Sequence, residues 1–534
     1  MGGGLAPAAA AGRAAEYKGR VTWYVLFTAA IASSGGLLFG YDLGVTGGVE
    51  ASPTFLAHFF PGVAASKQEY KHSSDAHNPY CEYDSATLSL FTSSLFLAAM
   101  CASLPASYVT RRLGRKASMI AGGLWYLLGG ALSAGAQNLG MLVAGRILLG
   151  FGVGFANQSV PLYLSEMAPF HARGALNILF QLATTTGVLT AQLVNYALRD
   201  FDWGWRLSLG LACAPAALLA VGGALLPDSP AGLMEQGRAH DARCVLERVR
   251  GTQDVGAELA DIADAAATAA SVTQLQAFRN ILTRREFSPQ LALGVLIPTF
   301  QQWTGLNAIV FFVPQLFAAL GSAADAALLN AVVIGGANVL GTLVSILLAD
   351  RVGRRALLLQ AGVQMAGALA AVAALLGTSL GQHPATALPK GTVWATLALI
   401  CVFVLGYSWS WGPMSWLIPS EIQTLETRSA GFSISVFVHF LMMFALGQSF
   451  LPMMCGMQFG VFAFFAGMVV LATIFVWLCV PETKGVPLEE IYPLYAKHPL
   501  WRRAIGEKAT AAALALERCN SIAAAAGRAE AASI

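Results

Sequence analysis

The chain has 534 residues, of which 56% are hydrophobic and only 11% are charged, and its net charge is +3. Soluble domains usually have about 25% charged residues, so the composition argues against an ordinary soluble enzyme and favours a membrane protein. The small net charge and the lack of an aromatic-interleaved basic patch argue against nucleic acid as a partner. The sequence has no zinc, P-loop or dinucleotide motif, so we expect no metal site and no cofactor.

Twelve apolar segments are long enough to cross a bilayer, which takes about 20 helical residues. They predict an all-α membrane protein with twelve transmembrane helices in two six-helix halves. The predicted helices are 21–46, 86–109, 117–137, 140–164, 174–198 and 204–226 in the first half, then 290–318, 327–349, 355–378, 392–416, 430–451 and 458–480 in the second.

The segments between these helices divide the chain into domains. We expect two transmembrane domains, 21–226 and 290–480, in which the long connection 47–85 forms an extracellular cap. The other parts are an N-terminal cytosolic segment (1–20), a polar cytosolic linker with short helices (227–289) and a cytosolic tail (481–534).

Three motifs of the first half recur in the same order in the second half. The basic segment 111–116 has a counterpart at 350–355, at an offset of 350 − 111 = 239 residues. Glu166 corresponds to Glu421 (421 − 166 = 255), and Pro227 corresponds to Pro481 (481 − 227 = 254). Such parallel copies of one unit are typical of a class of secondary transporters, so we expect the two halves to be pseudo-symmetric.

Positive charge predicts the orientation of the chain in the membrane. Lys and Arg gather in the connections after the second, fourth, eighth and tenth predicted helices, whereas the connections after the third, seventh and eleventh have none. Because cytosolic loops are rich in Lys and Arg, we expect both termini in the cytosol of a multi-pass plasma-membrane protein.

Asp42 lies at the end of a long apolar run and is flanked by glycines. A charge at the centre of a bilayer costs at least about 2.5–3.5 kcal/mol, so this acid is a candidate functional group. Arg146, the only cation within the predicted fourth helix, is its natural counter-charge. One interpretation is a structural ion pair between two helices. The other is a carboxylate that binds a proton, with an affinity that depends on whether Arg146 is near.

Five uncharged amides also lie within predicted helices. Any one of them could join two helices by hydrogen bonds, but together they offer the paired donors and acceptors that suit sugar hydroxyls. Trp411, with Trp303 and Trp409, would supply flat apolar faces for a sugar ring, although a single intramembrane Trp more often serves packing. The amides are Gln181, Gln301, Gln302, Asn307 and Asn338.

The motifs at the predicted cytosolic end combine acids with cations. We expect them to form a charge network that holds the two halves together while the outer side is open. Charges that only set the orientation would explain the Arg residues but not the paired Glu residues. The expected members are Arg112, Arg115, Glu166, Arg173, Arg351, Arg354, Glu421 and Arg428.

These motifs resemble those of the sugar porter family of the major facilitator superfamily. The resemblance rests on Gly145-Arg146 and on the segments 161–169, 301–307, 419–428 and 481–485, and it extends from about residue 17 to about residue 501. Within the family, the segment 40–48 and the loop around Cys81 most resemble plant and green-algal hexose–proton symporters.

The resemblance implies a role for several of these residues. It implies that Asp42 is the proton acceptor and is paired with Arg146, and that Phe39 and Leu43 couple this site to the sugar. It implies sugar contacts from the five amides and a cavity wall formed by Trp411.

The resemblance also implies a disulfide between Cys81 in the cap and Cys455 in the second half. The chain departs from the family pattern at His439, which stands where relatives usually have an Asn that contacts the sugar. Whether this ring contacts sugar or only packs between Phe437 and Phe440 stays open.

Together these features predict a monomeric transporter in membrane lipid that carries a hexose, such as glucose or galactose, into the cell with a proton. One alternative is a facilitator without proton coupling, which would not need Asp42. Another is a sugar sensor that does not transport, although such proteins often have long cytosolic extensions. An intramembrane enzyme is least favoured, because no nucleophile–base pair falls within the predicted helices.

Overall fold

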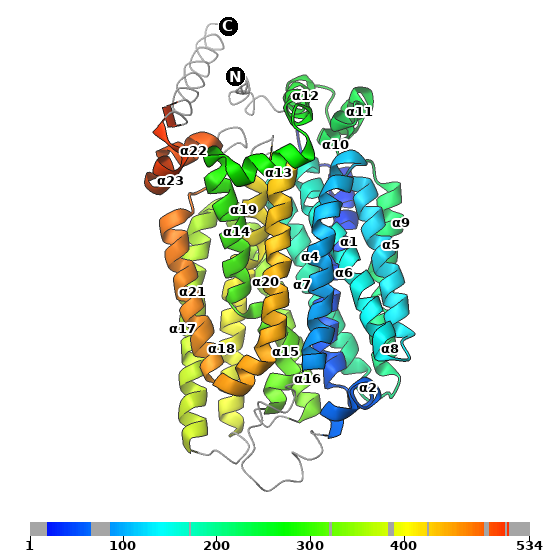
Figure 1. Cartoon of the computed structure of the whole chain (residues 1–534), viewed down its shortest axis with the longest axis vertical. Coiled ribbons are helices and arrows are strands. Elements are labelled where there is room, and N and C mark those ends of the chain that lie inside the picture. The colour runs from blue at the N-terminus through cyan, green and yellow to red at the C-terminus, as the bar shows by residue number, and fades with distance from the viewer. Residues whose placement is uncertain are drawn as a thin grey trace.

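The computed structural model describes residues 19–65, 86–169, 172–319, 323–382, 389–423, 427–484, 491–507 and 510–511. The described chain is helical and forms an elongated bundle, with the linker helices at one end and the short helix α2 at the other (Figure 1). We call these the linker end and the α2 end.

Six transmembrane segments form the first half. Helix α2 (Pro53–Phe59) follows the first segment, and the last segment is divided between α8 and α9. The six segments are α1 (Trp23–Ala51), α4 (Ala86–Arg112), α5 (Arg115–Ala134), α6 (Leu139–Met167), α7 (Arg173–Ala197), and α8 (Gly204–Gly210) with α9 (Cys213–Leu225).

The second half has six corresponding segments, two of which are broken. They are α14 (Ser288–Trp303) with α15 (Leu306–Ala319), α16 (Ala324–Val352), α17 (Arg354–Gln382), α18 (Lys390–Ser408) with α19 (Trp411–Glu421), α20 (Arg428–Met457) and α21 (Gly460–Cys479). Short helices lie outside the bundle. They are α10 (Pro230–Glu235), α11 (Ala239–Arg250), α12 (Gly256–Ala270), α13 (Gln274–Thr283), η4 (Arg285–Phe287), α22 (Ile491–Lys497) and α23 (Pro499–Ile505).

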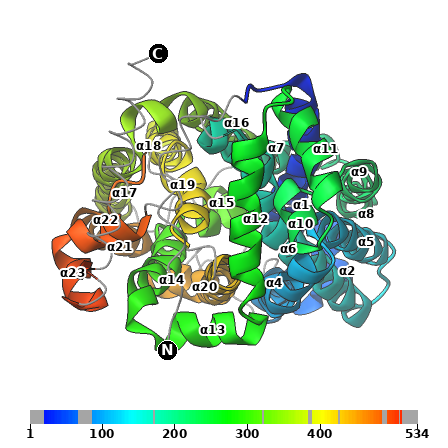
Figure 2. The ribbon, with the colours of Figure 1, turned by 90° about the horizontal axis from the view of Figure 1, so that it is seen from above.

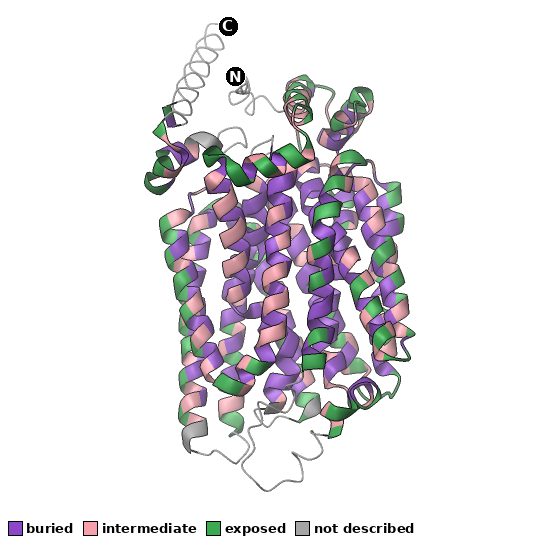
Figure 3. Cartoon of the chain, viewed as in Figure 1, coloured by how far each residue is buried: buried purple, intermediate pink, exposed green. Residues whose placement is uncertain are grey.

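Ten of these segments are long and apolar enough to cross a membrane by length and composition alone. The other two are α7, whose buried face holds several amides, and the broken pair α14–α15. The described residues therefore contain the twelve predicted segments, 10 + 2 = 12. Large apolar side chains on the outside of the bundle, such as Leu124, Leu340 and Trp477, are exposed where lipid would surround them (Figure 3).

The helices differ from the prediction at the end of the first segment and at the breaks within later segments. The first helix runs to Ala51 rather than ending at residue 46, so the segment predicted as a cap begins with helix. The seventh segment is broken at Gly305, which has φ +87° and lies against the Phe465 ring, where a Cβ would clash. A residue with a side chain would be strained in this left-handed conformation, so the glycine permits the break.

The two halves lie side by side, as the view from the linker end shows (Figure 2). Three helix pairs form most of the contact between them, namely α1 with α15, α4 with α20 and α7 with α16. Within the first half, α1 packs closely on α7 through a row of glycines. A Cβ on Gly36, Gly40 or Gly44 would lie within 2.5 Å of a backbone oxygen of α7. This close contact fixes the position of the middle of α1, which bears Asp42.

Candidate functional site

Asp42 and Arg146 form an ion pair in the middle of the first half. A guanidinium nitrogen of Arg146, on α6, lies 2.6 Å from the Asp42 carboxylate, and both side chains are buried. A second nitrogen donates to the Thr46 hydroxyl one turn further along α1, also at 2.6 Å. The guanidinium also stacks over the ring of Phe91, 4.2 Å from its centre. The two predicted proton-site residues are therefore in direct contact.

A cavity lined by residues of both halves lies next to this ion pair. Phe39 and Leu43, which flank Asp42 on α1, form part of its wall. The amides face it from both halves, so the cavity combines donors and acceptors with apolar surface. Seven of the nine residues predicted to contact sugar line it: Phe39, Leu43, Gln181, Gln301, Asn307, Asn338 and His439.

The amides of the second half form a hydrogen-bonded network around the cavity. Asn307 donates to the Gln302 side chain at 2.8 Å, and the Gln302 amide lies 3.1 Å from a ring nitrogen of His439. Gln301 donates to the Tyr407 hydroxyl at 2.8 Å, and Asn338 accepts from Ser408 at 2.7 Å. Gln302 is thus a buried connector behind the cavity wall, and it orients both Asn307 and His439.

The His439 ring is enclosed by aromatic side chains. Its centre lies 4.6 Å from that of Trp416 and 6.1 Å from that of Phe39. The ring borders the cavity, as contact with sugar would require, and its centre also lies 5.2 Å from that of Phe440, as packing would require. The choice between the two interpretations therefore stays open. A neutral imidazole can accept from Gln302 through one nitrogen and donate to a ligand through the other.

Trp411 does not line the cavity, whereas Trp416 does. The Trp411 ring is fully buried one turn away, and its indole N–H has no hydrogen-bond partner among the described residues. The sequence analysis did not single out Trp416, Tyr407, Thr184 or Thr185, which also line the cavity. Both Trp residues lie on α19, and the rotation of this helix after the break that separates it from α18 places Trp416 at the cavity. No sequence pattern that we used predicts that break.

Cys455 lies in the last turn of α20 and is disulfide-bonded. Cys81 lies outside the described residues, so its pairing with Cys455 stays a prediction. Among the described residues, Cys101, Cys213, Cys244, Cys401 and Cys479 are free thiols.

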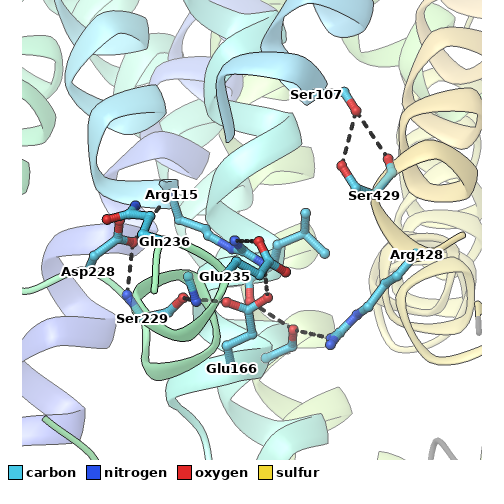
Figure 4. A network of polar contacts seen from close by, with 12 residues as sticks. Ser107, Arg115, Glu166, Asp228, Ser229, Glu235, Gln236, Arg428 and Ser429 are labelled. Carbon is cyan, nitrogen blue, oxygen red and sulfur yellow. Dashed lines mark hydrogen bonds and ion pairs between the residues drawn. The ribbon is translucent and has the colours of Figure 1, made fainter. Parts of the chain in front are cut away.

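A charge network lies at the linker end of the first half (Figure 4). Arg115 pairs with Glu166 at 2.8 Å and with Glu235 at 2.6 Å, and all of these charges are at least partly buried. The Asp228 carboxylate accepts from the backbone N–H of Arg115 at 3.0 Å and so caps α5. Burial raises the pKa of Asp228, while the Ser229 N–H and the Arg115 charge oppose this shift. Gly114, at φ +94°, leaves the room that this carboxylate needs.

The second half repeats this network with different residues. Arg354 pairs with Glu421 at 3.2 Å, as Arg115 does with Glu166. The Glu482 carboxylate accepts from the backbone N–H of Arg354 at 3.0 Å and so takes the place of Asp228. Gly353, at φ +105°, corresponds to Gly114. The internal repeat in the sequence therefore corresponds to the same set of contacts in each half.

Several contacts at the linker end join the two halves. Arg428 donates to the Ser165 hydroxyl at 3.0 Å, and the hydroxyls of Ser107 and Ser429 lie 3.1 Å apart (Figure 4). Arg173 acts electrostatically on Glu421, which belongs to the opposite half.

Two of the expected network members lie elsewhere. Arg112 is exposed and stacks on Tyr108 of its own helix. Arg351 is also exposed, and its backbone oxygen accepts from Lys484. The network is thus built on Arg115 and Arg354, the arginine that directly follows the glycine of each basic segment.

The halves also meet at the α2 end of the cavity. Gln315 of α15 donates to the backbone oxygen of Gly47 on α1 at 3.2 Å, and Ser93 donates to Gln448 at 2.8 Å. Nearer the surface, Arg199 pairs with Asp325 at 3.0 Å. The described residues therefore join the halves on both sides of the cavity, as in an occluded conformation.

Comparisons with known proteins agree with this architecture. A family profile described as "Sugar (and other) transporter" matches residues 28–495. The chain is 50% identical over 513 residues to H(+)/hexose cotransporter 2 of Parachlorella kessleri, covering 96% of this chain and 94% of that one. It is 49% identical over 510 residues to Sugar transport protein MST3 of Oryza sativa subsp. japonica, covering 95% and 97%.

Among solved structures, the chain resembles the major facilitator superfamily proton:xylose symporter XylE bound to 6-bromo-6-deoxy-D-glucose. The TM-score is 0.73 at 26% identity, covering 88% of this chain and 98% of that one. These matches confirm the twelve-helix major facilitator fold. The chain therefore belongs to the sugar transporter family of the major facilitator superfamily and is a transporter, not an enzyme.

Proposed function

We propose that the protein brings hexoses into the cell together with protons. Relatives that are about half identical over nearly the whole chain are named as H(+)/hexose cotransporters and sugar transport proteins. The observation that supports the proposal best is the position of α1. Its buried Asp42 pairs with Arg146, while the neighbouring Phe39 and Leu43 form the cavity wall. Protonation of Asp42 can thus move the cavity wall, because Phe39 and Leu43 lie on the same helix.

Alternating access follows from this arrangement. When the α2 end is open, Asp42 takes up a proton and a hexose binds between the amides of the two halves. Protonation removes the charge that holds Arg146, so α1 can move with the sugar and the α2 end can close. After the linker end opens, Arg146 again favours the ionised carboxylate, and the proton leaves with the sugar. The cytosolic network has to separate in this step.

The proposal also includes the orientation of the protein in its membrane. We infer that the linker end faces the cytosol, because the basic segments lie there, and that both termini lie on that side. We also propose that the protein lies in the plasma membrane and functions as a monomer. The two transmembrane domains 21–226 and 290–480 are its structural units.

Uptake into yeast that lacks its own hexose transporters tests this proposal. The parent should accumulate labelled hexose against a gradient and make the external medium more alkaline as it does so. Asp42→Asn should abolish both accumulation and alkalinisation, because an amide cannot take up a proton, while exchange of sugar across the membrane persists. Substitution of the exposed Asp264→Asn is the matched control and should change neither.

Each other outcome identifies a different function. Equilibrating uptake by the parent without proton movement would indicate a facilitator. Sugar binding without any uptake would indicate a sensor. Unchanged accumulation by Asp42→Asn would show that proton coupling does not depend on this carboxylate.

A further inference from the structure

Glu50 is a second buried carboxyl on α1, which the mechanism above does not use. It lies eight residues after Asp42 (50 − 42 = 8), or about 12 Å along the helix axis towards the α2 end. Its side chain is 0% exposed. Glu50 is not among the predicted site residues, because the predicted first helix ends at residue 46 and leaves Glu50 in the outer connection.

The partners of Glu50 are neutral. The Thr92 hydroxyl of α4 is hydrogen-bonded to one carboxyl oxygen, and the Gln315 amide of α15 lies 3.5 Å from the other. Among the described residues, no Lys, Arg or His lies within ion-pair distance of Glu50. A buried carboxylate without an ion-pair partner is much more costly than the neutral acid.

The hydrogen-bond geometry also suits a protonated carboxyl. The Thr92 hydroxyl, which has a single hydrogen, is within hydrogen-bond distance of both Glu50 and the backbone oxygen of Leu88, the latter at 3.2 Å. If Glu50 is protonated, it donates to Thr92, and Thr92 donates to Leu88, so both bonds form. If Glu50 is ionised, the two oxygens compete for one hydrogen and only one bond forms.

The ionisable groups around this turn of α1 are few. Arg146 of α6 acts electrostatically on Glu50, but its hydrogen bonds go to Asp42 and Thr46. Helix α15 has no ionisable residue, and the Arg residues of α4 and α7 lie at the opposite ends of those helices. The other cations and imidazoles that the structure describes near the first-half part of the α2 end have other partners. His58 of α2 lies against Phe59 and Trp205, Arg199 pairs with Asp200 and Asp325, and Arg206 of α8 donates to the Ala134 backbone oxygen at 3.1 Å.

Glu50 lies on the contact that must separate when the α2 end opens. Gln315 belongs to the second half, and its amide joins Glu50 and the backbone oxygen of Gly47 in the first half. At Gly47 the backbones of α1 and α15 are so close that a Cβ would lie 1.9 Å from the Phe311 oxygen. Closure of this end therefore removes Glu50 from water and places it against α15.

We propose that Glu50 is a second proton-binding carboxyl of this transporter, and that it is protonated whenever the α2 end of the cavity is closed. The reaction is the uptake of one proton from external water by the ionised carboxylate, and no other bond changes. Asp42, Glu50 and Arg146 together carry no net charge when one of the two carboxyls holds a proton. This inference adds a second proton-binding site to the proposed symport, and it rests on that proposed function.

The purified full-length protein in lipid vesicles allows a direct test. Asp42→Asn serves as the starting variant, because it leaves Glu50 as the one carboxyl at this site. Its infrared spectrum should contain the absorption of a buried protonated carboxyl. Adding Glu50→Gln should remove that absorption, whereas adding Glu286→Gln, at an exposed carboxylate of η4, should keep it.

Sugar exchange by the same variants gives an independent measurement. Exchange by Asp42→Asn should fall as the pH rises, by about tenfold for each unit above the pKa of Glu50, because the protonated fraction falls in that proportion. With Glu50→Gln added, exchange should change by less than about twofold over the same range, since an amide cannot ionise. If the double variant is not delivered to the membrane, Glu50→Gln in the otherwise unchanged chain serves for the infrared measurement.

The outcomes separate this inference from the proposed function. Infrared spectra or pH profiles that Glu50→Gln leaves unchanged would overturn the inference, even if the parent accumulates hexose with protons. If the parent shows no proton-coupled accumulation, the proposed function fails. The infrared comparison then still decides whether Glu50 holds a proton.

Discussion

Gln181 offers an amide to the cavity, and this amide has no hydrogen-bond partner among the described residues. It lies on α7 of the first half, opposite Gln301 and Asn338 of the second. Those two amides are already held by Tyr407 and Ser408. A sugar placed between them would contact one unengaged amide and two oriented ones, so binding would draw the halves together.

Replacing Gln181, Gln301 or Asn338 by Ala should therefore weaken hexose binding by about 1–3 kcal/mol each, because polar partners would be left unpaired. The half-saturation concentration for uptake should rise by about 5-fold to 150-fold, with little change in the amount of protein at the membrane. Gln360→Ala, at an exposed amide on α17, is the control and should behave as the parent does. Unaltered half-saturation in all three variants would mean that these amides only join helices.

Most residues of the ion pair and the cavity wall that the sequence predicted stand out because their chemistry is unusual for a membrane. A carboxylate, an arginine and several amides inside apolar segments are each costly without a partner, so they could be found without any structure. Trp416 and Glu50 could not be found in this way. The first depends on how α19 is rotated after a break, and the second on a helix end five residues later than predicted (51 − 46 = 5).

Helix α1 connects the Asp42–Arg146 ion pair, the cavity and the contact at the α2 end. Its glycines bring it against α7 on one side, while Gly47 brings it against α15 on the other. Glycine in the middle of a helix usually lowers stability by roughly 0.5–1 kcal/mol relative to alanine. At these positions we expect glycine to be more stabilising than alanine, because any side chain would push the two helices apart.

Gly40→Ala should therefore destabilise the protein, although alanine favours helix. The added Cβ would lie 1.8 Å from the Thr184 backbone oxygen, and relief of such overpacking typically costs about 1–3 kcal/mol. Thermal unfolding of the purified protein should show a lower midpoint. Gly367→Ala on α17 is the matched control, because no atom lies within 4 Å of its added Cβ, and it should unfold at the parent's temperature or above. Equal midpoints for the two variants would contradict the role given to the α1–α7 contact.

At the scale of the whole molecule, the sequence predicted the twelve helices and the repeat because both leave long-range patterns. The repeat is visible in the structure as two equivalent networks, in which Arg115 and Arg354 hold the corresponding Glu residues. The breaks at Gly305 and after Ser408 were not predicted. They depend on packing between segments that are far apart in sequence, such as Gly305 against Phe465, and a local pattern has no information about such contacts.

The contacts between the halves at the linker end should keep this end of the cavity closed. Arg428 belongs to the second half and donates to Ser165 of the first, so Arg428→Gln should weaken this closure and favour the inward-open state. Fluorescent labels on cysteines introduced at the exposed Leu113 and Val352, in a chain without the exposed Cys101 and Cys244, would report the separation of the halves. Their energy transfer should fall in the Arg428→Gln variant.

Arg112→Gln is the control, since Arg112 is exposed and stacks on Tyr108 of its own half, and it should leave the transfer unchanged. Equal transfer in the two variants would show that this hydrogen bond does not hold the linker end closed.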